Sequence, residues 1–392
     1  MRRRSVEEFN PYSRRHLGNP FPIYTELRES HPVYLNERRG FWTITRYEDV
    51  HGCLKDWRSF CSGQGITLDG FSGLKPMLIL MDPPRHDELR RVMLHAFTPK
   101  VIAGMEATVR RIATVLVDDL VASGRAGEEI DLVHDFGAPL PIMVIAEMLG
   151  IDPADHAKFR QWSNGIMLAN GPDAAELLQC YGAIFDYFES IVAERRRDPR
   201  DDLVSAILQA EVDGQSLTDD EVLGFCALLL IAGNETTTNL LGNIAVILHQ
   251  NRDVRQQLID HPKLFPTAVE EFLRYDGSVP TLTRTLTRDI TLHGQQLSEG
   301  QKVLLVTAAA NRDPRQFENA ESVDIQRDPN PHLGLGVGIH YCMGARLARQ
   351  EARLGFQILL ERMPGYEVTI DKVEYINTPS VRGPVRLPIA IG

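Results

Sequence analysis

A glycine-rich loop that ends in a single cysteine constrains this chain more than any other segment. After His332, glycines occupy the alternate positions 334, 336 and 338, and Cys342 follows them. Alternating glycines let a backbone lie very close to a flat ligand, because no Cβ atom stands in the way. The run from Ala345 to Leu360 favours a helix, and the N-terminus of a helix stabilises a nearby thiolate. Since no second cysteine lies close by, the pattern favours an axial metal ligand over a disulfide or a zinc site.

The composition predicts a globular protein. A chain of 392 residues is long enough for one large domain or two ordinary ones. A net charge of −11 argues against nucleic acid as a partner. The basic start is not followed by the apolar core of a signal peptide, and the longest apolar run, Phe225 to Ala232, is too short to act as a membrane anchor. Five irregularly spaced cysteines favour a reducing cytoplasm.

The pattern of apolar residues predicts one α+β domain, predominantly α-helical, over residues 1–392. Residues 1–20 are expected to form a flexible N-terminal segment, and the glycine-rich residues 61–81 a long loop. Two strand-like runs, Pro32–Leu35 and Phe41–Thr45, predict a hairpin. Further strands are expected at 289–292 and 302–306. Helices are predicted at 86–96, 99–123, 139–149, 153–168, 173–197, 201–211, 218–250 (starting at a capping box) and 252–275 (broken at Pro262 and Pro266).

The longest helical pattern, residues 218–250, has an unusual centre. Gly233 in mid-helix costs roughly 1 kcal/mol relative to alanine. Thr236 is placed to return its hydroxyl to the carbonyl of Ala232, which locally opens or bends a helix. Glu235 adds a second polar group to an apolar helix, and this is costly unless the group serves a function. The alternative is a glycine that packs against another helix, with threonines that are simply satisfied.

Several charged residues give weaker signals. Glu271 and Arg274 lie three apart on one helix face, where such pairs are usually surface decoration worth a few tenths of a kcal/mol. His86 and Arg90 fall one helical turn apart after two prolines, where they could jointly hold carboxylates. Each of these residues, taken alone, is more often solvated or structural. Two further candidate carboxylate ligands are Arg284 and His340.

Taken in order, these motifs resemble those of the cytochrome P450 monooxygenases, particularly the soluble bacterial kind. The sequence Asp-Pro-Pro-x-His-x-x-x-Arg at 82–90 is followed by Ala-Gly-x-Glu-Thr at 232–236 and by Glu-x-x-Arg at 271–274. The cysteine loop at 336–344 then reads Gly-x-Gly-x-His-x-Cys-x-Gly. The match covers most of the chain. It implies a single haem-binding domain with a long central helix over the haem and small β-sheets.

The resemblance implies a role for each matched residue around haem b. Cys342 would be the proximal thiolate ligand of the iron, and its electron donation would favour O–O bond cleavage. Thr236 would hydrogen-bond the O2 cosubstrate, while Glu235 would help to relay protons. Glu271 and Arg274 would form a buried network with the loop before the cysteine. The remaining cofactor-binding positions would be His86, Arg90, Arg284 and His340 at the haem propionates, together with Ala232, Gly233, Leu335, Gly336 and Gly344.

The resemblance implies something further for Gly233 and for Leu335. Gly233 would let the long helix bulge where oxygen sits. The family usually has phenylalanine seven residues before the cysteine, but this chain has Leu335. Leucine keeps the apolar character and loses the flat aromatic contact. The hypothesis is a modest change in the shielding of the thiolate and in the iron potential.

The resemblance also implies the reaction and its partners. O2 would be used to hydroxylate or otherwise oxidise a lipophilic small molecule, in secondary metabolism or catabolism, by a cytoplasmic monomer. Electrons from NAD(P)H would arrive through a separate ferredoxin and ferredoxin reductase, and four arginines could form a basic docking patch. Substrate contacts are expected from residues 61–81 and 160–185 and from Leu229, Val279 and Leu282, which are mostly apolar. The four arginines are Arg90, Arg91, Arg346 and Arg349.

Two other functions stay open at this point. One is a peroxide-dependent haem-thiolate enzyme, and the other is a haem sensor or carrier. Glu235 and Thr236 argue against the first, because proton delivery to O2 is needed only on the O2-dependent route.

Overall fold

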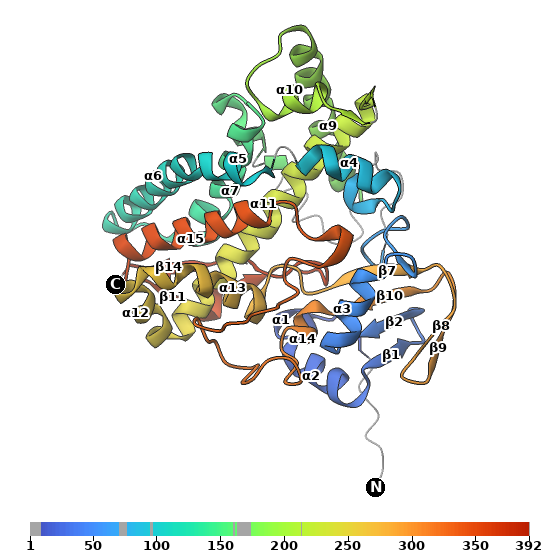
Figure 1. The fold of residues 1–392 in the computed structure, drawn as a ribbon. Coiled ribbons are helices and arrows are strands. Elements are labelled where there is room, and N and C mark those ends of the chain that lie inside the picture. The colour runs from blue at the N-terminus through green and yellow to red at the C-terminus, as the bar shows by residue number, and fades with distance from the viewer. Residues whose placement is uncertain are drawn as a thin grey trace.

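The computed structural model describes residues 9–69, 77–94, 97–159, 161–162, 174–212 and 214–391. The fold is predominantly helical, as predicted, with one long helix through the middle of the molecule and a sheet to one side (Figure 1). Two segments expected to contact substrate, 61–81 and 160–185, lie partly outside the described residues.

The long helix is α11 (Asp219–Gln250), and it begins where the capping box was predicted. The Thr218 hydroxyl accepts a hydrogen bond from the Glu221 N–H at 3.3 Å, and the Glu221 carboxylate accepts one from the Thr218 N–H at 2.9 Å. Four helices make the most extensive contacts with α11, most of whose side chains are buried. They are α7 (Pro139–Met148), α9 (Ala174–Arg197), α13 (Phe265–Asp276) and α15 (Ala345–Arg362).

The bulge expected at Gly233 does not form, because α11 is one uninterrupted α-helix. A Cβ atom at Gly233 would lie 2.4 Å from Cδ1 of Ile145 on α7, so Gly233 faces this neighbouring helix and a larger residue would require the Ile145 side chain to shift. The Thr236 hydroxyl donates to the Ala232 carbonyl at 2.7 Å, as predicted. The structure therefore agrees with the helix-packing alternative for this glycine.

Most of the other helices lie close to their predicted ranges. The helix in 201–211 is shorter, because α10 (Leu203–Leu208) ends before the strand at 211–212. The range 153–168 begins with a single turn, η4 (Pro153–Asp155), and lies partly outside the described residues. The range 99–123 forms two helices, because α5 (Pro99–Gly104) ends at a glycine and α6 (Glu106–Arg125) begins beyond it. The break predicted near Pro262 is confirmed, since a short turn separates α12 (Arg252–Asp260) from α13. α15 packs along α6, and both lie on the same side of the molecule (Figure 1).

A five-stranded sheet lies at the other side of the molecule (Figure 1). Alternate side chains of its inner strand β10 (Lys302–Leu305) enter different apolar clusters. Val303 and Leu305 pack with α3 (Tyr47–Lys55), and Leu304 packs with α2 (Phe21–Ser30). The predicted hairpin pairs antiparallel, whereas β2 and β10 pair in parallel. The strand order is β1 (Val33–Asn36), β2 (Phe41–Ile44), β10 (Lys302–Leu305), β7 (Leu282–Leu286) and β3 (Phe60–Cys61).

Part of the N-terminal segment that was expected to be flexible packs against the protein. Phe9 is fully buried, its ring centroid is 6.3 Å from that of Tyr24, and its carbonyl accepts a hydrogen bond from Asn36 at 2.7 Å. Helix α1 (Arg14–Gly18) follows.

The remaining elements are short. The helices are α2 (Phe21–Ser30), α3 (Tyr47–Lys55), α4 (Arg85–Leu94), α10 (Leu203–Leu208) and α14 (Thr307–Ala310). Single turns are η1 (Leu78–Leu80), η3 (Val133–Gly137), η4 (Pro153–Asp155), η5 (Pro262–Leu264), η6 (Gly338–His340) and η7 (Ile370–Lys372). The strands of the small sheets are β4 (Ile130–Asp131), β5 (Glu211–Val212), β6 (Gln215–Ser216), β8 (Ile290–Leu292), β9 (Gln295–Leu297), β11 (Glu367–Val368), β12 (Glu374–Tyr375), β13 (Pro384–Arg386) and β14 (Pro388–Ala390). No helix in the described part of the chain is both long and apolar enough to cross a membrane.

Candidate active site

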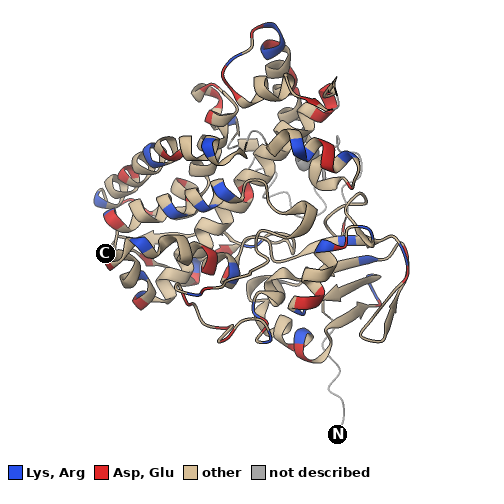
Figure 2. Ribbon diagram, in the orientation of Figure 1, with Lys and Arg blue, Asp and Glu red and all other residues tan. Residues whose placement is uncertain are grey.

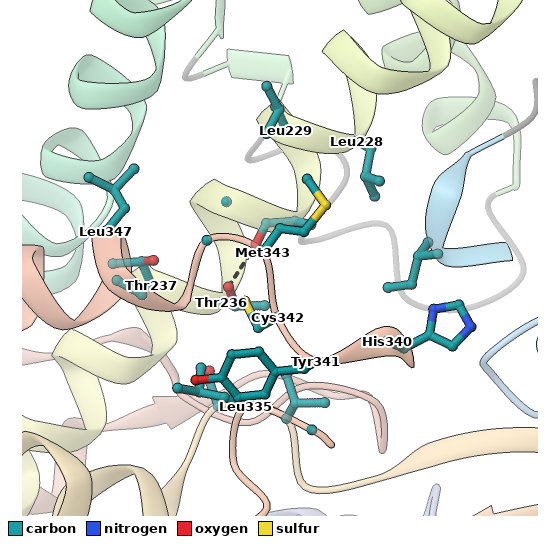
Figure 3. Close-up of a pocket in the computed structure, with 18 of the residues that line it drawn as sticks. Leu228, Leu229, Thr236, Thr237, Leu335, His340, Tyr341, Cys342, Met343 and Leu347 are labelled. Carbon is teal, nitrogen blue, oxygen red and sulfur yellow. Dashed lines mark hydrogen bonds between the residues drawn. The ribbon is translucent and has the colours of Figure 1, made fainter. Parts of the chain in front are cut away.

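A cavity of about 260 Å³ lies between α11 and the loop that carries Cys342. Figure 3 shows this loop beside the part of α11 that carries Thr236, with the hydrogen bond from Thr236 drawn as a dashed line. Most of the predicted site residues meet in its wall, although they come from four parts of the chain. They are Arg90 on α4; Leu229, Ala232, Gly233 and Thr236 on α11; Val279 and Leu282 after α13; and Leu335, Gly336, His340, Cys342 and Gly344 on the loop.

The glycines of the loop have different roles. Gly336 has a φ of +69°, which glycine adopts without strain. A Cβ atom at Gly334 would lie 2.5 Å from the carbonyl oxygen of Leu273 on α13, and one at Gly338 would lie 3.0 Å from that of Leu54 on α3. Gly334 and Gly338 therefore allow close packing against the protein itself, which the sequence did not indicate. The N–H of Cys342 donates to the Leu335 carbonyl at 2.9 Å and closes the loop.

The electrostatics around the Cys342 thiol differ from the sequence-based expectation. Burial raises the pKa of this thiol and outweighs the Gly344 N–H and the charges of Arg349 and Arg90, which act in the opposite direction. A bound cation would supply the missing stabilisation.

Nitrogen donors without partners are buried beside the loop. The Nε2 atoms of His86 and His340 have no hydrogen-bond partner among the described residues, and the two rings lie 4.4 Å apart. Arg284 on β7 is only 4% exposed and forms no ion pair with any described residue. Burial lowers the pKa of Arg284 to about 10. Burial and the nearby charge of Arg284 lower the pKa of His340 to about 3. An anionic ligand fits this cluster, because it would pair with the Arg284 guanidinium and approach imidazole nitrogens that have no other partner.

Glu271 and Arg274 on α13 are completely buried and hold the chain that leads to the loop. Their side chains form two parallel hydrogen bonds of 2.7 and 2.8 Å. Arg274 also donates to three backbone carbonyls, those of Asn311, Ala320 and Ser322, each at 2.8 Å. Glu271 accepts from the Asp324 N–H at 2.8 Å and from two side chains, those of Arg327 and Asn330. The pair thus fixes the backbone of 311–330, as the resemblance implied.

Two carboxyl groups near the cavity differ from the prediction. Glu235 is not among the residues that line the cavity, and burial raises its pKa to about 7. Glu351 on α15, which the sequence analysis did not single out, does line the cavity, and burial raises its pKa to about 8 despite a hydrogen bond from Thr237. Glu351 lies in the second turn of α15, where the spacing of polar residues is ordinary and gave no signal of burial.

Two apolar cavity residues on α11 were not predicted from the sequence. Phe225 and Leu228 line the cavity with Leu229. They precede Ala232 and Thr236 at helical spacing, so continuing the face of Thr236 toward the start of the helix would have found them. Leu78, which lies in the predicted contact segment 61–81, also lines the cavity, whereas Phe97 and Met148 were missed because they come from separate elements that no spacing rule connects.

Comparison with known proteins identifies the family. The family model for cytochrome P450 matches residues 15–379. Mycinamicin IV hydroxylase/epoxidase of Micromonospora griseorubida is 38% identical over 93% of this chain and 94% of its own length. Among solved structures, the cytochrome P450 CYP109Q5 from Chondromyces apiculatus matches with a TM-score of 0.91 and 35% identity, covering 99% of each chain. CYP109E1 from Bacillus megaterium, solved in complex with testosterone, matches with a TM-score of 0.86 and 36% identity over 95% of this chain and 99% of its own.

The chain belongs to the cytochrome P450 family. It is an oxidoreductase, a monooxygenase that uses haem b, O2 and electrons derived from NAD(P)H and delivered by redox partners. The described residues fit this cofactor, because the unpartnered donors match two propionate carboxylates. They contain no cluster of three or more His, Cys, Asp or Glu side chains that could hold a metal alone, so the porphyrin would supply most of the iron ligands.

Proposed function

We propose that Cys342 is the protein ligand of the haem iron and that His86, Arg90, Arg284 and His340 bind the propionates. The observation that supports this most strongly is that the cavity wall carries Cys342 while the buried, unpartnered donors lie beside it. When bound, the haem supplies the oxygen activation, and the protein orients substrate, excludes water and moves protons. The spectrum of the reduced protein under carbon monoxide tests the ligand, because a thiolate shifts the Soret band to the red.

Thr236 and Glu235 are proposed to deliver protons. Because the Thr236 hydroxyl donates to the Ala232 carbonyl, its oxygen is left to accept a hydrogen bond from the cavity side. Glu235 is the next residue along α11, and a carboxyl group with a pKa of about 7 can both bind and release a proton near neutral pH. The cavity itself has few polar groups, so these two residues would control when protons enter.

Thr236→Ala is expected to uncouple the enzyme. Electrons from NAD(P)H should still be consumed, but several-fold less product and correspondingly more hydrogen peroxide should form, because the hydroxyl that orders proton delivery is gone. The measurement is the ratio of product to NAD(P)H oxidised. Thr236→Ser, which keeps the hydroxyl, is the control and should remain coupled. Unchanged coupling in Thr236→Ala would instead favour a peroxide-dependent enzyme.

The substrate is proposed to be an uncharged lipophilic molecule, in secondary metabolism or catabolism. Leu229, Val279 and Leu282 give the cavity an apolar wall, together with Phe225 and Leu228. One relative is a mycinamicin IV hydroxylase/epoxidase, and another, CYP109E1, was solved in complex with testosterone. Mycinamicin-like compounds and steroids such as testosterone are therefore the first classes to test. Titrating each class against the ferric protein and following displacement of the iron-bound water by its absorbance change would rank them.

A separate ferredoxin, with its reductase, is the proposed electron donor. The protein itself is proposed to be a single-domain, cytoplasmic monomer. Basic residues are spaced along α15, which begins just after Cys342 (Figure 2). Arg346 is exposed and has no ion pair with the described residues, so its charge is available to a partner. Arg349 is less available, because it is paired with Glu270. The docking patch proposed on α15 therefore centres on Arg346.

Leu335→Phe tests the hypothesis about the cysteine loop. Leu335 lines the cavity, and its carbonyl accepts the N–H of Cys342 at 2.9 Å, so its side chain is well placed to shield the sulfur. The larger ring should slow haem loss to a haem-free acceptor protein and shift the reduction potential modestly. Leu229→Phe, on the α11 wall, is the matched control. If Leu335→Phe leaves both quantities unchanged, this hypothesis fails.

A further inference from the structure

A chain of hydrogen bonds joins the beginning and the end of the cysteine loop through Glu270. The Gly334 N–H donates to Nδ1 of His332 at 3.1 Å, so the proton of this ring lies on Nε2, which donates to the Glu270 carboxylate at 3.0 Å. Arg349 donates to the same carboxylate twice, at 2.5 and 2.8 Å. Its third nitrogen donates to the Tyr341 hydroxyl at 3.0 Å, and Tyr341 is the residue before Cys342.

The charges in this network balance. Burial opposes ionisation of Glu270, but the hydrogen bonds from His332 and Arg349 outweigh it and hold the pKa of this carboxyl at about 2. His332 accepts at Nδ1 and is therefore neutral, so one carboxylate faces one guanidinium. Both side chains of the pair are about 30% exposed, at 28% for Glu270 and 31% for Arg349, and the pair is anchored on two helices, α13 and α15.

We propose that Glu270 is a positioning residue that fastens both ends of the cysteine loop and neutralises Arg349, and that this pair sets the reduction potential at the Cys342 side of the haem. The inference rests on the proposed role of Cys342 as the iron ligand. Glu270 touches neither cofactor nor substrate in this role. It acts through Arg349 and Tyr341 on the backbone that presents the sulfur.

The sign of each effect follows from electrostatics. Reduction of the iron adds one negative charge, which a nearby uncompensated cation stabilises and a nearby uncompensated anion opposes. Glu270→Gln leaves Arg349 uncompensated, so the potential should rise. Arg349→Gln leaves Glu270 uncompensated, so the potential should fall. The double variant Glu270→Gln/Arg349→Gln has no net charge at this place and should return close to the original value.

The experiment is equilibrium redox titration of the haem-loaded variants without any redox partner. A change of about tenfold in the equilibrium constant for reduction, which equals about 59 mV for a one-electron couple, is expected for each single variant. Arg346 lies on the same helix as Arg349 and forms no ion pair with any described residue, so Arg346→Gln is the matched control. It should change the potential much less than Arg349→Gln does. Tyr341→Phe keeps all charges and loses one hydrogen bond, so faster haem loss is expected with little change in potential.

The outcomes separate this inference from the function proposed above. A red-shifted carbon monoxide band in each variant shows that the thiolate is still bound, so the potential can be interpreted. If that band is absent from the unmodified protein, the assignment of Cys342 fails first. If the band is present but the two single variants leave the potential unchanged or shift it in the same direction, the proposed role of Glu270 is wrong. A merely structural role predicts faster haem loss in both variants without opposite shifts.

Discussion

Cys342→His should remove the red-shifted Soret band of the reduced, carbon monoxide-bound protein and abolish O2-dependent product formation. A neutral imidazole donates less electron density to iron than a thiolate does, so O–O bond cleavage loses its main assistance. The loop should still form, because its closure uses backbone groups of residues 342 and 335 and not the sulfur. Haem should therefore bind with an altered spectrum. The absorbance spectrum and turnover with redox partners measure the two effects.

The control for this substitution is Cys53→Ala. Cys53 is buried on α3 and does not line the cavity, so its loss should leave the spectrum unchanged. A red-shifted band that persists in Cys342→His would assign the thiolate to another cysteine and overturn the proposed site.

Glu271→Gln is expected to remove a large part of the stability of the fold. Glu271 and Arg274 are both fully buried, and the substitution leaves the guanidinium without a counter-charge. Removing one partner of a buried pair typically costs about 3–5 kcal/mol, against a total stability of about 5–15 kcal/mol for a folded domain. Because Glu271 also orders the backbone near Asp324 and Asn330, haem should be lost before global unfolding. Urea unfolding followed by circular dichroism and by haem absorbance would resolve the two steps.

Asp118→Asn provides the comparison for a surface pair. Asp118 lies 3.5 Å from Arg362, and both side chains are about half exposed, at 54% and 53%. Exposed pairs contribute about 0–1 kcal/mol, so the unfolding midpoint should hardly change. If Glu271→Gln and Asp118→Asn lower the free energy of unfolding equally, burial of the Glu271–Arg274 pair has no energetic consequence.

Features of the fold that depend only on residues close together in the chain were predicted correctly from the sequence. The capping box at Thr218 and the break at Pro262 depend on neighbouring residues, and both were confirmed. The hydrogen bond from Thr236 to Ala232 likewise depends on helical spacing alone. The set of site residues followed from the order of motifs, since spacing within any single motif carried little information.

What the sequence could not predict depends on contacts between distant segments. The packing of Gly233 against Ile145 involves a residue far away in the chain. The burial of Glu351 and the pairing of Glu270 with Arg349 depend on how α13, α15 and the loop meet. Gly334 and Gly338 looked like ligand-binding glycines, although the backbones of α13 and α3 occupy the space beside them. None of these neighbours is visible in a local pattern.

The unpartnered Nε2 atoms of His86 and His340 and the buried charge of Arg284, which has no ion pair among the described residues, make the cofactor part of the folding equilibrium. Without two carboxylates, the native state keeps desolvated cations and donors that water would satisfy in the unfolded chain. A ligand that binds only the native state stabilises it by mass action, and here it would also cancel that penalty. We therefore expect the abundance of this protein in a cell to follow haem supply, with iron starvation removing the enzyme by proteolysis before it slows turnover.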